Sequence, residues 1–327
     1  MKNMVLSFSR QFAWLCSICS WLGLASDWYP FELMTHFRIQ YFGALIVCVP
    51  IVLLGHRGQN LTLPKFRPAL AEFTFFSVSL VLNLALLIGV FVGPLDSAAK
   101  QNNNSNVAPI KLSVFQVNVL ETNRDFKDIC DYVAAKDPDI ASFEEVGFEA
   151  AKALSTRLVK YPHSKVIARP DFFGLAIFSK YPFTAETLAL SKSGVPVLFA
   201  VMDVKGRRLN YTSVHTLPPL EPGFLSDRNQ EFANLSELRR KNEGPFIVAG
   251  DFNCSPWVAS FWRLCHDADL KDSEQSFGPQ PSWPSYLVLP FIPIDHFLVS
   301  KDIKVLSRSI GPYVGSDHYP VEMTISF

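Results

Sequence analysis

The sequence lacks an excess of charge of either sign, because 30 Lys and Arg residues balance 30 Asp and Glu residues in a chain of 327. A domain that coats nucleic acid shows a marked excess of Lys and Arg on one face. The balanced composition therefore argues against a basic nucleic-acid coat.

Cysteine is too sparse and too scattered to organise the fold. The six Cys residues show no spacing typical of a disulfide framework or a zinc site. Cys16 and Cys19 form a C-x-x-C pair, but they lie in an apolar run with no histidine nearby. We interpret these two residues as small hydrophobic side chains.

Long apolar runs fill the first third of the chain, and the mean hydropathy of +0.17 is unusually high for a soluble enzyme. Three uncharged stretches cover residues 11–26, 39–55 and 73–95. The third is long enough to cross about 30 Å of hydrocarbon as a helix. The first is short and also fits the apolar region of a signal peptide. We predict a membrane region of about three transmembrane helices within residues 1–96.

Basic residues in the short loops predict the orientation of these helices. Arg57, Lys65 and Arg67 lie between the second and third stretches. Three spans with this loop in the cytoplasm make the chain a multi-pass protein of the cell inner membrane, with its C-terminal part outside the cytoplasm. With only two spans, the C-terminal part would lie on the same side of the membrane as the N-terminus. The predicted side therefore depends on whether the first stretch spans the membrane.

An asparagine-rich polar stretch, residues 97–109, is predicted to be a linker. Residues 110–327 then alternate between short apolar runs and amphipathic segments, which is typical of a globular α/β domain. The expected helices cover residues 122 or 123 to 136, 149–159 and 226–240. The expected strands cover residues 111–119, 139–145, 163–168, 175–179, 196–204, 208–215, 246–249, 295–299, 304–310 and 319–327.

One strand end carries residues suited to a metal and a phosphate. Residues 246–249 form an apolar run, and Gly250 follows, where a backbone can approach a ligand closely. Asp251 and Asn253 are two residues apart, so on an extended backbone their side chains point the same way. A carboxylate beside an amide suits a hard cation next to a phosphate oxygen. An Asx turn that closes the strand is the alternative.

Matching pieces recur in order at other expected strand ends, namely Asn118, Glu145, His215, Asp295 and the run Gly315-Ser316-Asp317-His318. With Asp251 and Asn253 they resemble the endonuclease/exonuclease/phosphatase superfamily, the metal-dependent group that includes DNase I, and in particular its membrane-anchored bacterial members. The resemblance covers roughly residues 110–327. It implies an α/β fold, the DNase I-like four-layer αββα sandwich, preceded here by the transmembrane region.

The resemblance also implies roles for these residues, with Mg²⁺ or Mn²⁺ as cofactor. The expected metal ligands are Glu145, Asp317, Asn118 and Asp251. The expected catalytic residues are His318, oriented by Asp295, together with His215, Asp251 and Asn253. The expected substrate contacts are Asn118, Asn253, Trp257 and Trp283.

The chain departs from the family pattern at two positions. Glu144 stands where the family more often has Gln, and a carboxylate there would add negative charge. DNase-like members support the second histidine with a Glu, but residues 172–175, the corresponding region for His215, offer none. His296 neighbours Asp295 on a strand and is therefore expected to point to the opposite face.

The implied activity is hydrolysis of a phosphodiester by in-line attack of activated water, in a membrane-anchored, nuclease-like phosphoesterase. One alternative is a phosphatase or phospholipase-type hydrolase of lipid head groups. Another is a non-catalytic membrane-anchored binding module, against which the intact set of site residues argues. The expected partners are a phosphoester substrate, either nucleic acid or a phospholipid head group, and the lipid bilayer. No protein partner is predicted.

Overall fold

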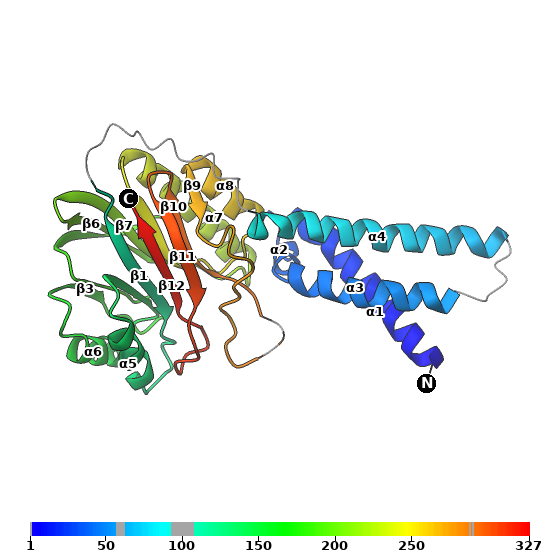
Figure 1. Ribbon diagram of the computed structural model, residues 1–327, viewed down its shortest axis with the longest axis horizontal. Helices are drawn as coiled ribbons and strands as arrows, with labels where there is room; N and C mark the ends of the chain where they lie inside the picture. The colour runs from blue at the N-terminus through cyan, green and yellow to red at the C-terminus, as the bar shows by residue number, and fades with distance from the viewer. Residues whose placement is uncertain (1, 57–62, 93–107, 288, 290) are drawn as a thin grey trace. The chain divides into compact units, whose positions relative to one another are not determined.

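The computed structural model describes residues 2–56, 63–92, 108–287, 289 and 291–327 (Figure 1). The chain forms two compact units, one of residues 1–89 with 257–259 and one of residues 90–256 with 260–327. Most of the predicted linker, residues 97–107, lies outside the described residues. We call the two units the helical unit and the catalytic unit.

The helical unit is built from the apolar runs of the sequence. Its elements are α1 (Lys2–Leu22), a 3₁₀ turn (Gly23–Ala25), α2 (Phe31–Thr35), α3 (Arg38–His56) and most of α4 (Leu63–Phe91). Small and branched side chains pack between the helices, and Cys16 and Cys48 are buried among them. Both cysteines are free thiols. The burial of Cys16 agrees with its interpretation as a small hydrophobic residue, whereas Cys19 is only partly buried.

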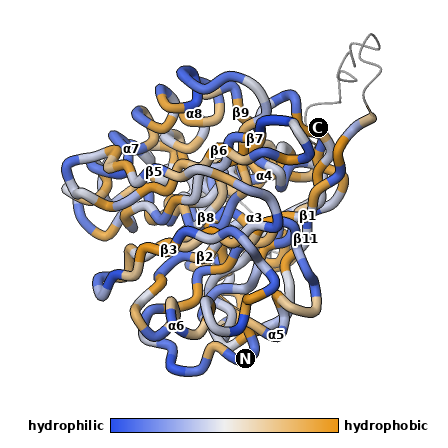
Figure 2. Tube along the Cα trace, turned by 90° about the vertical axis from the view of Figure 1, so that its left-hand side faces the viewer, coloured by the Kyte–Doolittle hydropathy of each residue, from blue (hydrophilic) through white to orange (hydrophobic). Residues whose placement is uncertain are grey.

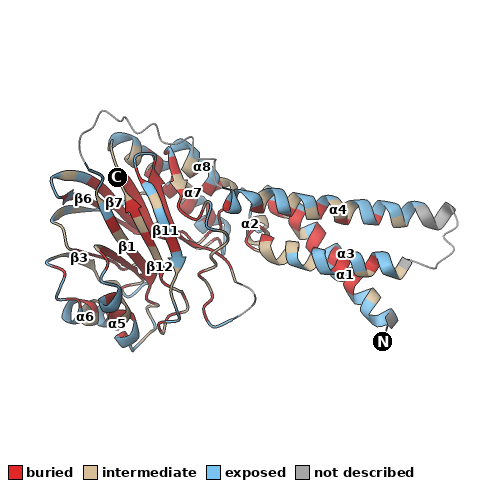
Figure 3. Ribbon diagram, in the orientation of Figure 1, coloured by how far each residue is buried: buried red, intermediate tan, exposed pale blue. Residues whose placement is uncertain are grey.

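Two of these helices are long and apolar enough to cross a membrane, Arg38–Gly55 of α3 and Arg67–Phe91 of α4. Only 28% of each segment is buried, which is unlike the core helix of a soluble protein. Figure 3 shows α4 pale blue, and thus exposed, along much of its length. Helix α1 does not belong to this pair because Lys2, Arg10 and several serines lower its hydropathy. Two of the three predicted spans therefore have the expected character.

The catalytic unit contains two six-stranded sheets. The first has the order β11 (Lys304–Ile310), β12 (Val321–Ser326), β1 (Lys111–Asn118), β2 (Ile140–Glu144), β4 (Leu175–Ser179), β3 (His163–Ile167). The second has the order β5 (Phe183–Ala189), β6 (Pro196–Val204), β7 (Arg207–His215), β8 (Phe246–Asp251), β10 (Asp295–Ser300), β9 (Leu270–Asp272). The helices of this unit are α5 (Lys127–Lys136), α6 (Phe148–Arg157), α7 (Pro222–Lys241) and α8 (Ala259–Asp267).

Alternation along the strands separates two apolar layers. One cluster lies between the sheets and includes Val114, Ile140, Ile247 and Phe297. A second includes Phe115 and lies between the first sheet and helices α5 and α6. Polar and apolar residues are interleaved along the outer helices (Figure 2), whereas β1 is largely buried and β12 alternates between buried and half-buried residues (Figure 3). The predicted DNase I-like sandwich is confirmed.

Several expected boundaries were wrong. Helix α5 begins at Lys127, because the Asn123 side chain accepts a hydrogen bond from the Asp125 backbone and closes a turn there. Helix α7 begins at Pro222 rather than at Ser226, and proline suits the first turn of a helix. Strands β5 and β9 and helix α8 were not predicted. For β5 the reason is that the strand is largely exposed and has no apolar run.

Strand pairing brings the expected site residues to one edge of the two sheets. In the parallel pair β1–β2, the strands end side by side at Asn118 and Glu144. In the parallel pair β7–β8, they end side by side at His215 and Asp251. The antiparallel strands β10 and β12 begin there, with Asp295 opposite Asp251. We call this edge, with the loops that leave it, the site edge.

Candidate active site

Asp251, at the end of β8, lies at the centre of the candidate active site. Its Oδ2 atom is 3.6 Å from the Nε2 atoms of both His215 and His318. Asn118 Nδ2 donates to the same oxygen at 3.3 Å. Burial, partly opposed by His318, raises the pKa of Asp251 to about 6. Three nitrogen atoms, from β1, β7 and the loop before β12, therefore converge on one carboxylate oxygen.

His318 and Asp295 form the expected pair, with Nδ1 and Oδ2 2.8 Å apart. A carboxylate only accepts hydrogen bonds, so Nδ1 carries the hydrogen and Nε2 faces Asp251. Burial would lower the pKa of His318, but the charges of Asp295 and Asp251 outweigh it and raise the pKa to about 10. The pKa of Asp295 is lowered by His318 despite its burial.

His215 is supported by a backbone carbonyl rather than by a carboxylate. Its Nδ1 atom lies 2.9 Å from the carbonyl oxygen of Phe172. Phe172 has a φ of 67°, a left-handed conformation that few non-glycine residues adopt. Because the carbonyl only accepts, Nδ1 carries the hydrogen and Nε2 points to Asp251. No sequence signal identifies this partner, because every residue has a carbonyl.

Asn118 joins two of the expected metal ligands. Its Nδ2 atom donates to Glu145 Oε1 at 2.9 Å as well as to Asp251. Its Oδ1 accepts from the Leu120 backbone, so its assignment as a metal ligand stays a prediction. Glu145 has a φ of 57°, and its Oε2 accepts from the Glu121 backbone at 2.9 Å.

Trp283 is linked to Asp317, which was expected to approach the metal. Trp283 Nε1 donates to Asp317 Oδ2 at 3.0 Å, and the Ser285 backbone donates to the Asp317 carbonyl at 2.7 Å. Trp283 therefore holds a site carboxylate, a role that the sequence did not suggest. Trp257 is buried, and its predicted contact with substrate stays a prediction.

The loop after β8 is held by side-chain contacts. Asn253 has a φ of 48°, and its Nδ2 donates to the Thr216 carbonyl at 2.8 Å. Arg228, fully buried on α7, reaches the Asn253 carbonyl at 3.4 Å. Glycine at position 250 was expected to allow a ligand to approach the backbone, but the structure gives another reason for it. A Cβ atom there would lie 1.8 Å from the Val214 carbonyl, so glycine is needed for the approach of β7, not of a ligand.

The surroundings of Glu144 oppose the negative charge that its sequence position suggested. The residue is fully buried at the end of β2, and burial raises its pKa well above the usual range. Neither carboxyl oxygen has a hydrogen-bond partner among the described residues. A neutral carboxylic acid has nearly the shape of a Gln side chain, the residue more usual in the family.

The residues present fit a divalent metal. Asp251, Asp295 and His318 offer ligand atoms that all lie within 4.8 Å of one another. Asp317 Oδ1 and Asp295 Oδ1 are buried without a partner among the described residues. Unpaired carboxylate oxygens suit a hard cation such as Mg²⁺ or Mn²⁺.

A second buried cluster lies on the opposite face of β10. His296 Nδ1 is 3.0 Å from Asp272 Oδ2, and Nε2 is 3.0 Å from the Cys254 carbonyl. Both partners only accept, so both nitrogens carry hydrogen and the ring is an imidazolium. Arg308 adds a second positive charge beside Asp272 and Glu274. No nitrogen of His296 is left to bind a metal, and the predicted opposite orientation of His296 is confirmed.

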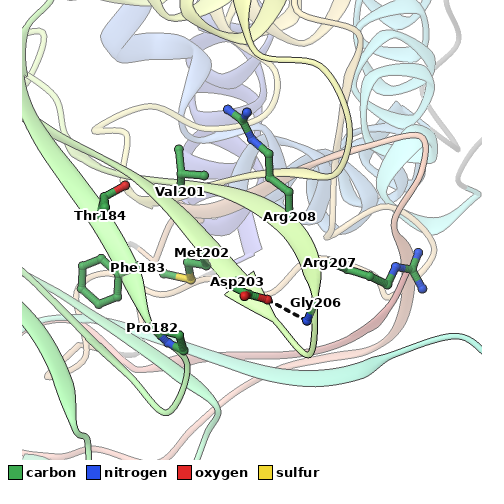
Figure 4. A pocket seen from close by; sticks show the side chains of 9 residues that line it. All are labelled: Pro182, Phe183, Thr184, Val201, Met202, Asp203, Gly206, Arg207 and Arg208. Atoms are coloured by element: carbon green, nitrogen blue, oxygen red, sulfur yellow. Dashed lines mark hydrogen bonds between the residues drawn. The ribbon is translucent and has the colours of Figure 1, made fainter.

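An open cavity of about 510 Å³ lies away from these clusters. It is lined by residues of β5, β6 and β7 around the β6–β7 turn, where Asp203 accepts from the Gly206 backbone (Figure 4). None of the expected site residues lines it.

The comparisons agree with this geometry. The model of the endonuclease/exonuclease/phosphatase family matches residues 115–318. The chain belongs to this family. Its members hydrolyse phosphoester bonds, and they generally use divalent metals. A search of curated proteins found no match.

Solved structures of the family share the fold of the catalytic unit. Danio rerio TDP2, complexed with a single-strand DNA product, is 19% identical, with a TM-score of 0.56 over 66% of this chain and 98% of its own. A family protein from Bacteroides thetaiotaomicron is 17% identical, with a TM-score of 0.56 over 68% and 99%. Sphingomyelinase C from Streptomyces griseocarneus is 17% identical, with a TM-score of 0.52 over 66% and 99%.

Proposed function

We propose that this family hydrolase is a membrane-anchored, divalent-metal-dependent phosphodiesterase. The observation that carries the proposal is the convergence of His215 Nε2, His318 Nε2 and Asn118 Nδ2 on Asp251 Oδ2. Both imidazoles have their Nδ1 hydrogen fixed by an acceptor, so both present Nε2 to the same space. Groups aimed in this way can bind and protonate the oxygens of one phosphate.

Each side chain has a defined part in this reaction. In its imidazolium form, His215 donates from Nε2 to a phosphate oxygen, and Asn118 Nδ2 donates to another in place of Asp251, where charge develops as water attacks in line. Asp251 accepts the proton of the attacking water. The His318–Asp295 pair can do so only when His318 is deprotonated, since the pKa of His318 is raised to about 10. Asn253, held by Thr216, completes the donors beside Asp251. Glu145, Asp251 and Asp317 would hold the metal, which when bound polarises the phosphate and neutralises its developing charge.

The anchoring part of the proposal rests on α3 and α4, which have the length and composition of membrane spans. We propose the same organisation as the sequence suggested, with a membrane region to residue 96, a linker over 97–109 and the catalytic domain over 110–327. With α1 as a third span, the catalytic domain lies outside the cytoplasm. Alkaline phosphatase and green fluorescent protein fusions at the C-terminus would report that side.

The activity is tested on the full chain in detergent. We expect hydrolysis of the diester bis-p-nitrophenyl phosphate with Mg²⁺ or Mn²⁺, slower release from the monoester p-nitrophenyl phosphate, and no activity in excess EDTA. The His318→Ala variant, purified in parallel, controls for contaminating phosphatases. Equal rates with and without EDTA, or equal rates in both proteins, would refute the proposal.

A further inference from the structure

Exposed apolar side chains are concentrated at the site edge. Tyr286, Leu289 and Leu220 are 65%, 64% and 63% exposed. Single exposed apolar residues are common in soluble domains, but a group of them on one surface is not. Others on this edge are Phe148, Phe172 and Tyr313. We call these six residues the apolar rim.

The members of the rim lie on the segments that also position the site. Phe172 belongs to the loop whose carbonyl holds His215, and Leu220 follows His215. Tyr286 and Leu289 follow Trp283, which holds Asp317, and Tyr313 precedes Asp317 in the β11–β12 loop. The rim therefore surrounds the polar site rather than lying on an unrelated face.

The opposite edge of the sheets has a different surface. Its turns carry charged residues such as Asp137, Lys180, Lys205 and Lys301. Within the described ranges, Val159 is the large apolar residue exposed in the connections of that edge. Exposed apolar residues elsewhere in this unit, such as Trp262 on α8, are scattered. An apolar surface concentrated at the mouth of a site indicates that the substrate is presented from an apolar phase.

The chemistry of the rim favours a lipid surface over a nucleic acid. Leu220 and Leu289 are aliphatic and do not stack on bases as aromatic rings do. Cations near the site are paired with acids, Arg169 with Asp171 and Arg124 with Glu149, so they offer little charge to a phosphate backbone. The chain also carries two helices suited to a bilayer, so it brings its own lipid surface.

We infer that the apolar rim inserts into the bilayer surface and that the substrate is the head-group phosphodiester of a membrane phospholipid. The inference rests on the proposed function and names its substrate. The oxygen of water forms a bond to phosphorus, one P–O ester bond of the head group breaks, and the departing alkoxide takes up a proton. Release of diacylglycerol or of phosphatidic acid would both be hydrolysis of this diester.

The test uses the full chain reconstituted into phosphatidylcholine and phosphatidylglycerol vesicles with Mg²⁺. The double variant Leu220→Ser/Leu289→Ser is expected to hydrolyse vesicle lipid at least tenfold more slowly and to keep its rate on bis-p-nitrophenyl phosphate. The matched control is Val159→Ser/Leu306→Ser, two exposed residues off the rim, and it should change neither rate.

A second measurement does not depend on turnover. An environment-sensitive fluorophore attached at Leu289→Cys should show blue-shifted emission in the vesicles, and the same label at Val159→Cys should report water. Water-like emission at both positions overturns the inference, as does an equal loss on both substrates.

The two proposals fail in distinguishable ways. If the wild type cleaves bis-p-nitrophenyl phosphate but not vesicle lipid, the lipid assignment is wrong and the phosphodiesterase proposal stands. If single-stranded DNA is cleaved and the rim variant slows that reaction instead, the rim is a nucleic-acid surface. If the wild type cleaves no diester at all, both proposals are wrong.

Discussion

The two faces of β10 carry two buried clusters made from the same kinds of residue. On one face, Asp295 binds His318 beside Asp251. On the other, His296 binds Asp272 beside Glu274 and Arg308. In the first, the Nε2 atoms of His215 and His318 both face Asp251 Oδ2 from 3.6 Å, beyond hydrogen-bond distance. In the second, both nitrogens of the histidine are bound to acceptors.

This difference shows what separates a reactive cluster from a structural one. In the second, two acids face one imidazolium and one guanidinium, so the charges balance within the protein. In the first, the acids Asp251, Asp295 and Asp317 outnumber the two histidines. Each cluster has a buried carboxylate oxygen without a partner among the described residues, so the number of charges, not the unpaired oxygen, separates the two. Buried charge without compensation is costly unless a ligand supplies the opposite charge, so the excess of acids favours a bound cation.

The largest expected effect comes from the pair in the first cluster. His318→Ala should lower kcat on a diester by roughly 10³-fold, within the usual range for general acid–base groups. Asp295→Asn should also be severe, and the double variant should be little worse than His318→Ala, because the two act as one unit. Steady-state kinetics of the three variants check this. Losses that multiply would show that Asp295 acts independently, as a metal ligand would.

Glu145→Gln should remove metal binding and lower the rate by about 10²-fold or more, since it deletes a charged ligand. In the wild type, Mg²⁺ at 100 times its Kd should stabilise the fold by about 2.7 kcal/mol. In the variant this metal-dependent shift of the melting temperature should disappear. Asp272→Asn is the matched control, and Mg²⁺ should still stabilise it.

Asp272→Asn should show the reverse pattern, a stability defect with nearly normal kinetics. Breaking a buried ion pair leaves His296 without its counter-charge and typically costs about 3 kcal/mol. Thermal unfolding in detergent should therefore shift down by several degrees, while kcat/KM below the transition stays within a few-fold. A large loss of activity in a folded variant would mean that this cluster takes part in the reaction.

The smallest effect is the pH dependence of that stability difference. The pKa of His296 is raised by Asp272 against the effect of burial, so its contribution is complete below about pH 6.5. This stabilising contribution of His296 is lost as the pH rises through the raised pKa of His296 in the folded protein. The pKa of Asp272 is lowered by His296, so its own contribution persists until strongly acidic pH. The gap in melting temperature between wild type and Asp272→Asn should therefore narrow from pH 6 to pH 9.

Much of this site could be predicted from residue order. Asn118, Asp251 and His215 end strands, and strand ends are visible as apolar runs that stop at polar residues. The supports of the site were not visible. The Phe172 carbonyl, Trp283 as the holder of Asp317 and the boundaries of α5 and α7 depend on contacts between distant segments or on turn geometry.

The sequence by itself determined the apolar helices, the alternating strands and the identity of the reactive side chains, because periodicity and local motifs are properties of neighbouring residues. Only the tertiary structure decided which groups are charged and which are paired. Glu144 and His296 illustrate this, since burial raises the pKa of the first and two hydrogen-bond acceptors favour the protonated form of the second. The segments that bury each group and supply its hydrogen-bond partners are far apart in the chain. Protonation states and the placement of the apolar rim therefore depend on how those segments pack in the folded protein.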